Sequence, residues 1–516
     1  MTAEERDGRA GSFDWHPEPE LLDYRDPARA REELVRLGEE TWRAAVDWLY
    51  QEAMRRPVGP DSYPQMRRRF FGERLRPAPA PRKPASSEEI LREFRERLAP
   101  YQFGAQNPRA FSYFTPPPLP MSISGEVLSQ WVHQGVDVWH AGPSAALVEE
   151  EVTAWLRELV GFDRGGWGVL TSGGVMANIM GLTAARDVHL ARLQGLDHRP
   201  RGRELEDVRV YASDQAHFSI RRALDVLGFP ADTLRVIPSD ERFRLRGPAV
   251  AEAVAADRAA GLLPFAIAAV CGSTNTGSVD DTGALADVAE REDLWLHVDA
   301  AYGGAARLSA RDAALVPDLE RADSVTVDPH KWFFQAYDIG ALVVRRREDL
   351  AVSFHGAPEY YRSTHPEDEP LNWYQYSIEG TRRFRALKLW FSWKHLGSDG
   401  FGRLVERNVD LARYMAARIA ASRDFEAAVP EPDLSVVCFR HLPGGTQRAV
   451  AMEPQALDAH QDRQQRALEV SGEGWVSTTR LRGRTYLRAG LVNYMATEAD
   501  VDAVLDALRR LAGPGS

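Results

Sequence analysis

The stretch Ser324-Val325-Thr326-Val327-Asp328-Pro329-His330-Lys331-Trp332 decides the fold of this chain. Its first four residues form a short β-rich run, and the run ends in a polar turn that presents a lysine beside a histidine. A second stretch, Leu294-Trp295-Leu296-His297-Val298-Asp299-Ala300-Ala301, has the same design, because an aspartate follows an apolar run. The two stretches predict neighbouring strands of one sheet, each with a charged side chain at its end.

A lysine and an aspartate at neighbouring strand ends are what pyridoxal 5'-phosphate (PLP) requires. The amine of Lys331 would form a Schiff base with the PLP aldehyde, and Asp299 would keep the pyridine nitrogen protonated so that the ring accepts electrons. Each residue alone has an ordinary explanation, since most lysines are solvated and most Asp-Ala turns are only turns. The two together favour a PLP site.

The middle of the chain, about residues 106 to 400, alternates short apolar runs with helical stretches. Near-continuous apolar strands between helices predict an α/β fold with a mostly parallel sheet that is covered on both faces. The runs are Trp167–Leu170, Val208–Tyr211, Phe265–Cys271, Leu294–Val298, Ser324–Val327 and Gly340–Val344.

Polar residues follow five of these runs, and ligand groups in such sheets collect beyond the carboxyl ends of the strands. Ser172-Gly173-Gly174 precedes a predicted helix from Val175 to Arg186 and would hold the cofactor phosphate on backbone N–H groups. His217 could stack on the pyridine ring, although a lone histidine is more often structural. Thr274 could bind the cofactor or the substrate carboxylate, and His330 the phosphate or the amine. His297, inside a strand, is expected to be a core residue.

The ends of the chain form two further parts. Residues 1–105 have helical patterns at Ala28–Met54 and Ser87–Leu98 and no strands, so their apolar stripes need a partner surface. This arm predicts a two-fold homodimer. Residues 401–516 read as a small α+β domain, which closes with a helix capped by Thr497 and Asp500.

Composition excludes several classes of protein. The 516 residues are 44% hydrophobic and 27% charged, and their net charge of −11 argues against nucleic acid or an anionic membrane as the main partner. Two cysteines, Cys271 and Cys438, cannot form a disulfide framework. The charged N-terminus is no signal peptide, and no apolar run is long enough to span a membrane. We therefore expect a cytoplasmic protein.

Taken together, these segments resemble the group II PLP-dependent amino-acid decarboxylases of fold type I. Tyr211–His217 looks like the segment of that family with the stacking histidine, and His297–Tyr302 looks like its pyridine-nitrogen segment. Asp328–Trp332 looks like its Schiff-base segment, and Arg382–Trp390 looks like its helix after the active-site loop. The likeness runs from about Asn107 to Val409.

The resemblance implies a PLP enzyme that decarboxylates an L-amino acid. Besides Lys331, Asp299 and His217, it places Ala301 and Asp328 at the cofactor. Two departures stand out. Val175 occupies a position that is usually Ser or Thr in the phosphate turn, so backbone N–H groups and Ser172 must hold more of the phosphate. Asp137 lies in a stretch that is apolar in aromatic-specific members, where it reaches the site from the partner subunit.

The loop His355–Tyr376 contains Tyr360 and Tyr361 and is rich in Gly, Pro, Asp and Glu. By the resemblance, Tyr360 is the loop acid that protonates the substrate carbon after CO2 has left, with Tyr361 as the alternative. A tyrosine there implies an amine product, whereas a phenylalanine is associated with aldehyde formation. A decarboxylating aldehyde synthase and a non-catalytic scaffold are the rival interpretations.

The substrate side chain is the least determined feature. Tyr113 and Phe114, with Trp139 nearby, could line an aromatic pocket, although aromatic residues are also ordinary in cores. Aromatic L-amino acids are the first expectation. An amino acid with a polar side chain, bound near Asp137, is the second.

Overall fold

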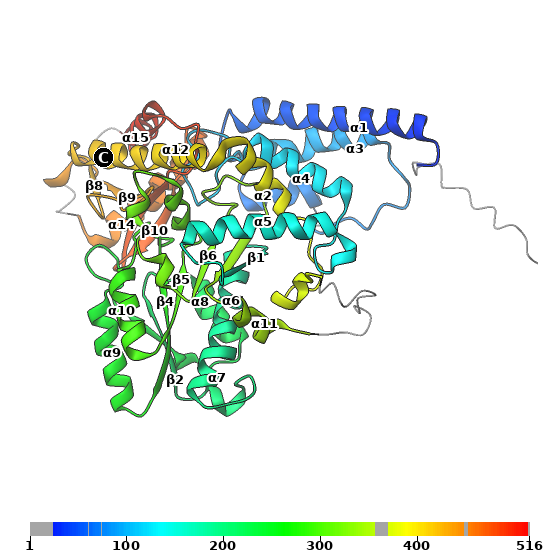
Figure 1. Cartoon of the computed structure of the whole chain (residues 1–516). Helices are drawn as coiled ribbons and strands as arrows, with labels where there is room; N and C mark the ends of the chain where they lie inside the picture. Colours follow the sequence, from blue (N-terminus) through cyan, green and yellow to red (C-terminus); the bar gives the residue numbers. More distant parts are fainter. Residues whose placement is uncertain (1–23, 60, 74, 357–369, 448–451, 514–516) are drawn as a thin grey trace, which may run out of the picture. The chain divides into compact units, whose positions relative to one another are not determined.

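The computed structural model describes residues 24–59, 61–73, 75–356, 370–447 and 452–513 (Figure 1). Its contacts divide the chain into two compact units, Met1–Gly104 and Ala105–Ser516. This division falls at the end of the predicted N-terminal arm.

The first unit is helical where it is described. Helix α1 (Pro27–Trp48) continues into η2 (Leu49–Ala53), and α3 (Ser87–Glu93) continues into η3 (Phe94–Leu98), so both predicted helices are confirmed. A shorter helix, α2 (Tyr63–Phe71), lies between them in the sequence. Asp26 caps α1 by accepting the N–H of Arg29, and Ser86 and Glu89 form a capping box on α3.

The second unit is built on a seven-stranded sheet with the order β1-β7-β6-β5-β4-β2-β3. Strand β7 pairs antiparallel with β1 and β6, and the other neighbours pair parallel, which confirms a mostly parallel α/β sheet. The strands are β1 (Trp167–Thr171), β2 (Val208–Ser213), β3 (Leu234–Ile237), β4 (Leu263–Val270), β5 (Trp295–Asp299), β6 (Ser324–Val327) and β7 (Gly340–Val344).

Helices cover both faces of this sheet. Alternate residues of β4 point to opposite sides, so Ile267 and Ala269 pack in one core while Ala266 and Ala268 pack in the other. The first core includes residues of α5 (Pro143–Val160), α9 (Gly247–Ala259) and α10 (Thr282–Glu292). The second includes residues of α6 (Gly174–Ala184) and α8 (Phe218–Val226). Burial on both faces explains why these strands read as continuous apolar runs.

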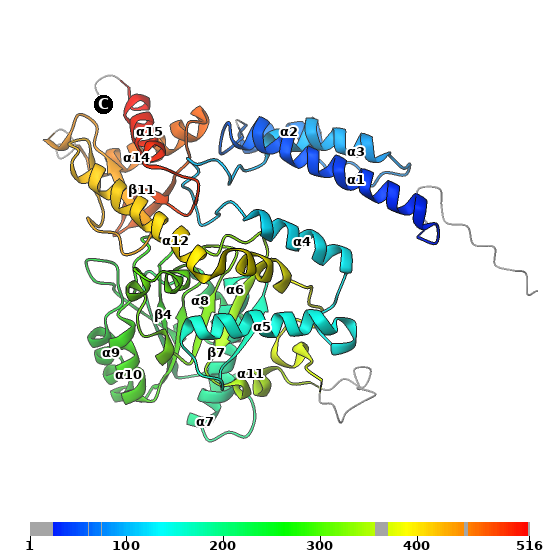
Figure 2. The ribbon, with the colours of Figure 1, turned by 45° about the horizontal axis from the view of Figure 1, so that its top comes forward.

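The C-terminal region adds a four-stranded antiparallel sheet with the order β10-β11-β9-β8. Its strands are β8 (Phe425–Ala427), β9 (Val436–His441), β10 (Ser477–Leu481) and β11 (Arg484–Gly490). Helices α14 (Pro454–Ser471) and α15 (Glu498–Leu511) pack on it, and the predicted cap of Thr497 and Asp500 is confirmed. Helix α12 (Ala386–Ala420) crosses the predicted 400/401 boundary, running from α5 to α15 with a bend at Gly397 (Figure 2).

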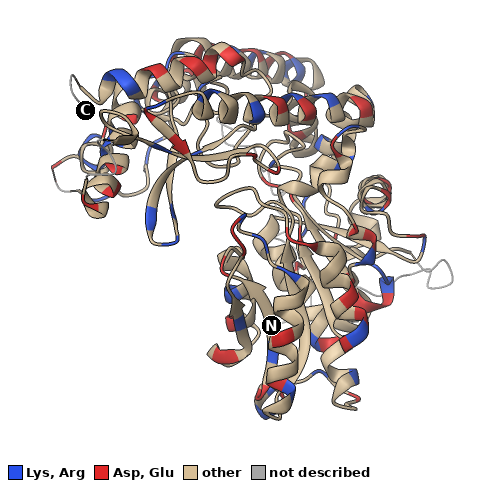
Figure 3. Cartoon of the chain, turned by 90° about the vertical axis from the view of Figure 1, so that its left-hand side faces the viewer, with Lys and Arg blue, Asp and Glu red and all other residues tan. Residues whose placement is uncertain are grey.

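Charge and polarity agree with the composition. On the face in Figure 3, lysine and arginine segments alternate with aspartate and glutamate segments along the helices. Both cysteines are buried free thiols, which agrees with the expectation that they form no disulfide framework, while the cytoplasmic location stays a prediction. Among the described residues, no helix is both long and apolar enough to cross a membrane.

Candidate active site

The topology brings the predicted polar segments to one edge of the main sheet. Strands β1, β2, β4, β5 and β6 run in the same direction, so their carboxyl ends meet there. Asp299 is the last residue of β5, where we expected it just after the strand. Lys331 follows β6 by four residues. A cofactor at this edge would be within reach of residues from five strands.

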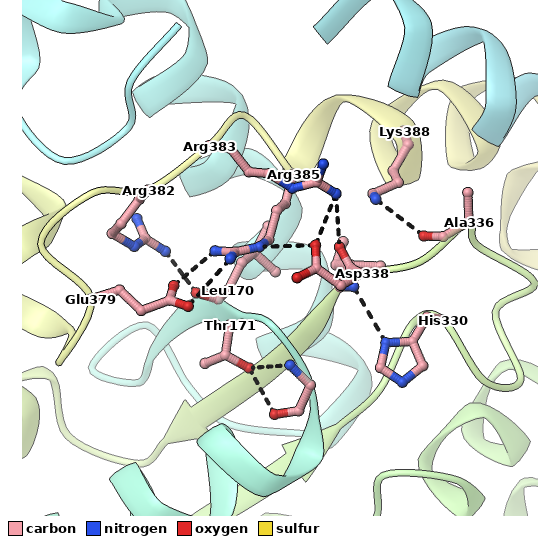
Figure 4. A network of polar contacts seen from close by, with 12 residues as sticks. Leu170, Thr171, His330, Ala336, Asp338, Glu379, Arg382, Arg383, Arg385 and Lys388 are labelled. Carbon is pink, nitrogen blue, oxygen red and sulfur yellow. Dashed lines mark hydrogen bonds and ion pairs between the residues drawn. The ribbon is translucent and has the colours of Figure 1, made fainter. Parts of the chain in front are cut away.

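The turn after β1 is shaped to receive an anion. Thr171 pins it, because the Thr171 hydroxyl accepts the Gly173 N–H at 3.2 Å and donates to the Gly173 carbonyl at 3.1 Å (Figure 4). Helix α6 begins at Gly174 and has no side-chain cap, which leaves the N–H groups of its first turn for a ligand. Ser172 and Val175 flank the turn and are half-buried, so a phosphate here would rest mainly on backbone donors.

The two glycines of this turn leave no room for a side chain. A Cβ on Gly173 would lie 3.1 Å from His330 Cε1, and one on Gly174 would lie 2.8 Å from Asp328 Oδ2. Gly173 also has a φ of 156°. The turn therefore packs directly against the segment that carries the candidate lysine.

Lys331 lies beside a buried carboxylate. Its Nζ is 3.1 Å from Asp328 Oδ2, and its side chain is 24% exposed. Burial by itself would lower the pKa of Lys331, but the negative charges of Asp328 and Asp299 outweigh burial and the pKa is raised. Asp328 Oδ1 is buried and has no hydrogen-bond partner among the described residues. A polar ligand beside Lys331 would complete this site.

His330 is held with its Nδ1 as an acceptor. The N–H of Ile339 donates to it at 3.3 Å, so the proton of a neutral imidazole is on Nε2 (Figure 4). Burial lowers the pKa of His330 and favours this neutral form. Nε2 lies 3.6 Å from Asp328 Oδ2, on the side of the glycine turn.

An ion-pair network supports the segment that positions His330. Asp338 pairs with Arg383 at 2.8 Å and with Arg385 at 3.5 Å, and Lys388 donates to the Ala336 carbonyl at 3.1 Å (Figure 4). Arg382, which is fully buried, donates to the Leu170 carbonyl at the end of β1 and pairs with Glu149. The segment Arg382–Lys388 therefore holds the residues before β7 against the end of β1.

Asp299 and His217 meet in a buried polar cluster. Asp299 is 6% exposed, and its Oδ1 accepts the N–H of Ala301 at 3.2 Å. His217 is the N-cap of α8, and its Nδ1 lies 2.8 Å from the Ser219 hydroxyl. Burial lowers the pKa of His217. The negative charges of Asp299 and Asp328 partly oppose this shift, and the positive charge of Lys331 adds to it. His297 is fully buried and bonded to Ser324, which confirms it as a core residue.

The structure separates the two aromatic residues of the predicted pocket. Phe114 is buried and stacks on Tyr302 at 4.1 Å between ring centroids, and Tyr302 stacks on Trp332 at 4.7 Å. Trp332, the last ring of this column, is the residue after Lys331 in the sequence. Tyr113 is instead 57% exposed and packs edge-on against Trp475.

Arg488 joins Phe114 to the segment after β4. Its guanidinium lies 4.6 Å from the centre of the Phe114 ring, and its Nε donates to the carbonyl of Thr274 at 2.8 Å. The side chain of Thr274 is exposed. Arg488 Nη2 is buried without a hydrogen-bond partner among the described residues, so it could donate to a bound carboxylate.

Three predicted residues are not placed at this edge by a described contact. Asp137 lies on the segment between α4 (Pro120–Val132) and α5, where its carbonyl accepts the N–H of Tyr374. We predicted that Asp137 reaches the site of the partner subunit, and this stays a prediction. Tyr360 and Tyr361 lie outside the described residues.

Comparison with known proteins identifies the family. Residues 71–442 match the model of the pyridoxal-dependent decarboxylase conserved domain, which covers well over half of the chain. The chain belongs to this family. It is therefore a PLP-dependent decarboxylase, and the fold expected from the resemblance is confirmed.

Individual relatives agree with this family. The decarboxylase is 34% identical to the aromatic-L-amino-acid decarboxylase of Bacillus atrophaeus over 75% of its own length and 78% of the relative. It is 31% identical to the L-2,4-diaminobutyrate decarboxylase of Acinetobacter baumannii over 66% of its own length and 68% of the relative. The crystal structure of Oryza sativa TDC with PLP and tryptamine superposes with a TM-score of 0.85 at 26% identity, covering 96% and 99% of the two chains.

The residues at the carboxyl edge fit PLP. The uncapped first turn of α6 suits a phosphate, Lys331 supplies a partly buried amine, and Asp299 is a buried carboxylate at the end of β5, which is three strands from β1 in the sheet order. Among the described residues, no group of His, Cys, Asp and Glu could hold a metal ion. Asp328 Oδ1, which has no hydrogen-bond partner among the described residues, could accept a hydrogen bond from a further polar group beside Lys331.

Sequence reasoning missed two residues of this site. Asn178 lies inside α6 and contacts Asp299, but an asparagine within a helix gives no signal of its own. Arg488 lies on β11, far from the strands that gave the motifs, and only the packing of the C-terminal sheet brings it to Phe114.

Proposed function

We propose that this decarboxylase converts an aromatic L-amino acid to its amine and CO2. The observation that carries the proposal is the buried column of stacked rings formed by Phe114, Tyr302 and Trp332, whose last member directly follows Lys331 in the sequence. The aromatic-L-amino-acid decarboxylase among the relatives supports it.

The residue roles in this proposal combine the geometry of the site with the sequence resemblance. Lys331 holds the cofactor covalently, and the N–H groups of the Gly173-Gly174 turn bind its phosphate together with His330 Nε2–H. Asp299 holds a proton at the ring nitrogen, while His217 fixes the plane of the ring. Bound PLP supplies an electron sink for the pair of electrons that remains on Cα when CO2 leaves. Ala301, Asp328, Ser172, Val175 and Thr274 complete the proposed cofactor contacts.

The final proton decides between an amine and an aldehyde. We propose Tyr360 as its donor, with Tyr361 as the alternative, on the basis of the sequence resemblance alone. Without a donor, the electron-rich carbon is open to reaction with O2, which would give aldehyde, ammonia and peroxide. Product analysis under air therefore separates the decarboxylase proposal from the aldehyde-synthase alternative.

A second candidate substrate has a polar side chain. It is favoured by Asp137 and by the similarity to the diaminobutyrate decarboxylase, since a carboxylate would attract a second amino group. In the predicted dimer, Asp137 of the partner subunit would bind this second amino group.

A substrate panel tests the proposed function. We expect PLP-loaded enzyme to release CO2 and amine from L-tryptophan, L-tyrosine or L-phenylalanine with a kcat/KM about tenfold to a hundredfold above that for L-2,4-diaminobutyrate, because a pocket built for an apolar ring leaves an ammonium group unpaired. Amine, aldehyde and peroxide are measured together. Preferred turnover of diaminobutyrate, or aldehyde as the main product, would contradict the proposal.

We also propose that the enzyme is a homodimer. Each unit has an exposed apolar helix face. In the first unit, Val35, Trp42 and Val46 share one side of α1 and are 54%, 52% and 40% exposed, and in the second unit Trp131 and Val132 of α4 are 56% and 49% exposed. Contiguous apolar faces of this kind support subunit contact rather than solvent contact.

Trp42 gives a test of the dimer. We expect Trp42→Glu to raise the dissociation constant of the dimer by about two to four orders of magnitude, because burial of a large apolar side chain contributes about 1.5–3 kcal/mol and a two-fold interface contains it twice. Sedimentation velocity over a range of concentrations measures this constant. Thr41→Glu, an exposed neighbour on α1, is the matched control and should leave it unchanged. A monomeric parent protein at micromolar concentration would refute the dimer.

A further inference from the structure

Asn178 is the centre of the polar cluster around Asp299. It is 1% exposed and lies in the middle of α6. Its Nδ2 donates to Asp299 Oδ2 and to the Ser219 hydroxyl, both at 2.8 Å. Its Oδ1 is 3.0 Å from His297 Nε2 and accepts from the Thr326 hydroxyl at 2.6 Å. An asparagine amide has two donors and two acceptor sites, so every one of them is used.

The carboxylate fixes the direction of these hydrogen bonds. An ionised Asp299 can only accept, so the amide nitrogen of Asn178 must face it and the amide oxygen must face His297. Since that oxygen only accepts, His297 carries its proton on Nε2. Burial lowers the pKa of His297 to about 4, which keeps the ring neutral.

The same logic continues behind His297. Its Nδ1 then accepts from the Ser324 hydroxyl at 2.8 Å, and the Ser324 oxygen accepts the indole N–H of Trp295 at 2.9 Å. Every polar side-chain hydrogen in this branch then has an acceptor, so its hydrogen bonds run in one direction from Trp295 to Asn178. Its hydrogens all point from the interior of the sheet toward Asp299.

The second branch reaches His217. Because the Ser219 oxygen accepts from Asn178, the Ser219 hydroxyl hydrogen is free to donate to His217 Nδ1 at 2.8 Å. The Ser219 N–H also points to Nδ1, at 3.4 Å. His217 Nδ1 is thus an acceptor, and the proton of a neutral His217 is on Nε2, away from α8.

We propose that Asn178 is a positioning residue that couples the two cofactor contacts: it aims the carboxylate of Asp299, and through Ser219 it holds His217 as the Nε2–H tautomer. His217 then acts in the site as a hydrogen-bond donor and not as a base. This inference rests on the proposed roles of Asp299 and His217, and it adds the protonation state in which they work.

The branches predict different effects for two substitutions. Asn178→Asp keeps the shape but sets a second carboxylate against Asp299, so the pair would share a proton and Asp299 would lose its hold on the ring nitrogen. Ser219→Ala keeps the bond between Asn178 and Asp299 and removes only the link to His217. A merely structural role for Asn178 would not separate cofactor affinity from the His217 tautomer in this way.

The experiment measures both quantities on the PLP-loaded enzyme and its apoenzyme. Fluorescence titration gives the PLP dissociation constant, and 15N NMR of protein with labelled histidine gives the tautomer. The chain has 13 histidines, so the His217 signals are identified by their absence in His217→Gln. Thr326→Val, which removes a donor to Asn178 Oδ1 without touching Asp299, is the control.

We expect parent His217 to be protonated on Nε2 alone. Asn178→Asp should weaken PLP binding by about tenfold or more, the size of one hydrogen bond to a charged group, and Thr326→Val should change it less. Ser219→Ala should leave PLP binding within about twofold and mix the two His217 tautomers. If Asn178→Asp does not fold, the Ser219→Ala result and the parent tautomer still decide.

Two results would overturn the proposal. One is parent His217 with its proton on Nδ1, and the other is a folded Asn178→Asp enzyme that binds PLP as the parent does. Asp299→Asn in the same titration distinguishes this failure from a failure of the proposed function. If Asp299→Asn also leaves the cofactor spectrum and the affinity unchanged, the assignment of Asp299 itself is wrong.

Discussion

Lys331→Ala is expected to remove the visible absorbance band of the bound cofactor and to lower the rate of decarboxylation by on the order of a thousandfold or more. The reason is that the covalent link to Lys331 holds the cofactor where the other residues can act on it. The structure favours Lys331 as the attachment point, since its amine is partly buried at the sheet edge beside Asp328, whose carboxylate borders the glycine turn. Absorbance spectra and CO2 release measure the two effects.

The chain offers a clean control for this prediction because it has only four lysines, Lys83, Lys331, Lys388 and Lys394. Lys388 is buried but pairs with Glu126 at 2.8 Å, and Lys394 is 52% exposed and pairs with Glu151. Lys394→Ala should therefore keep the band and the activity. After reduction with borohydride, peptide mass spectrometry should find the cofactor on Lys331, and a label on any of the other three would refute the assignment.

The main sheet could be predicted from the sequence because its strands are buried on both faces. Ser324–Val327 and Gly340–Val344 were predicted with the bounds that the structure shows, β1 is longer than predicted by one residue at its end, and β5 is shifted by one residue at both ends. Continuous apolar runs leave few alternatives, and parallel strands bring their carboxyl ends together. For this reason the sequence also indicated that Lys331 and Asp299 share one edge.

Other features depend on contacts that no local pattern reports. Strand β3 (Leu234–Ile237) lies at the edge of the sheet and is only partly buried, so it lacks a strong apolar signal. The antiparallel direction of β7 is not visible in its apolar run, which resembles those of the parallel strands. The stacking of Phe114 on Tyr302 and the position of Arg488 join segments more than a hundred residues apart.

The phosphate turn illustrates the same limit. The missing hydroxyl at Val175 was visible in the sequence, and it implied that the backbone must bind the phosphate. Which side chains close the turn was not visible, because His330 and Asp328 reach it from β6. Thr171 directly follows the predicted strand Trp167–Leu170, but its hydrogen bonds to Gly173, which fix the turn, could not be seen in the sequence.

Asp299→Ala is the second substitution for which we expect a large effect. A carboxylate next to the ring nitrogen favours the protonated, charged form, and an opposite charge at such a distance shifts a pKa by about 1–3 units. Loss of that charge lowers the fraction of protonated ring by about ten- to a thousandfold, and the rate of CO2 release should fall by a similar factor. Cofactor attachment to Lys331 should persist, since Asp299 does not form that bond.

The measurement compares single-turnover CO2 release with the absorbance of the bound cofactor. Asp214→Asn, an exposed aspartate on the segment after β2, is the matched control and should keep both within about twofold of the parent. Asp299→Glu should recover part of the rate, because it restores the charge in a less suitable position. A normal rate in Asp299→Ala would show that the ring nitrogen needs no carboxylate, and the electron sink would then have to work with an unprotonated ring. Loss of the cofactor band in Asp299→Ala would instead show that Asp299 acts through binding, because its charge also helps to keep the pKa of Lys331 raised.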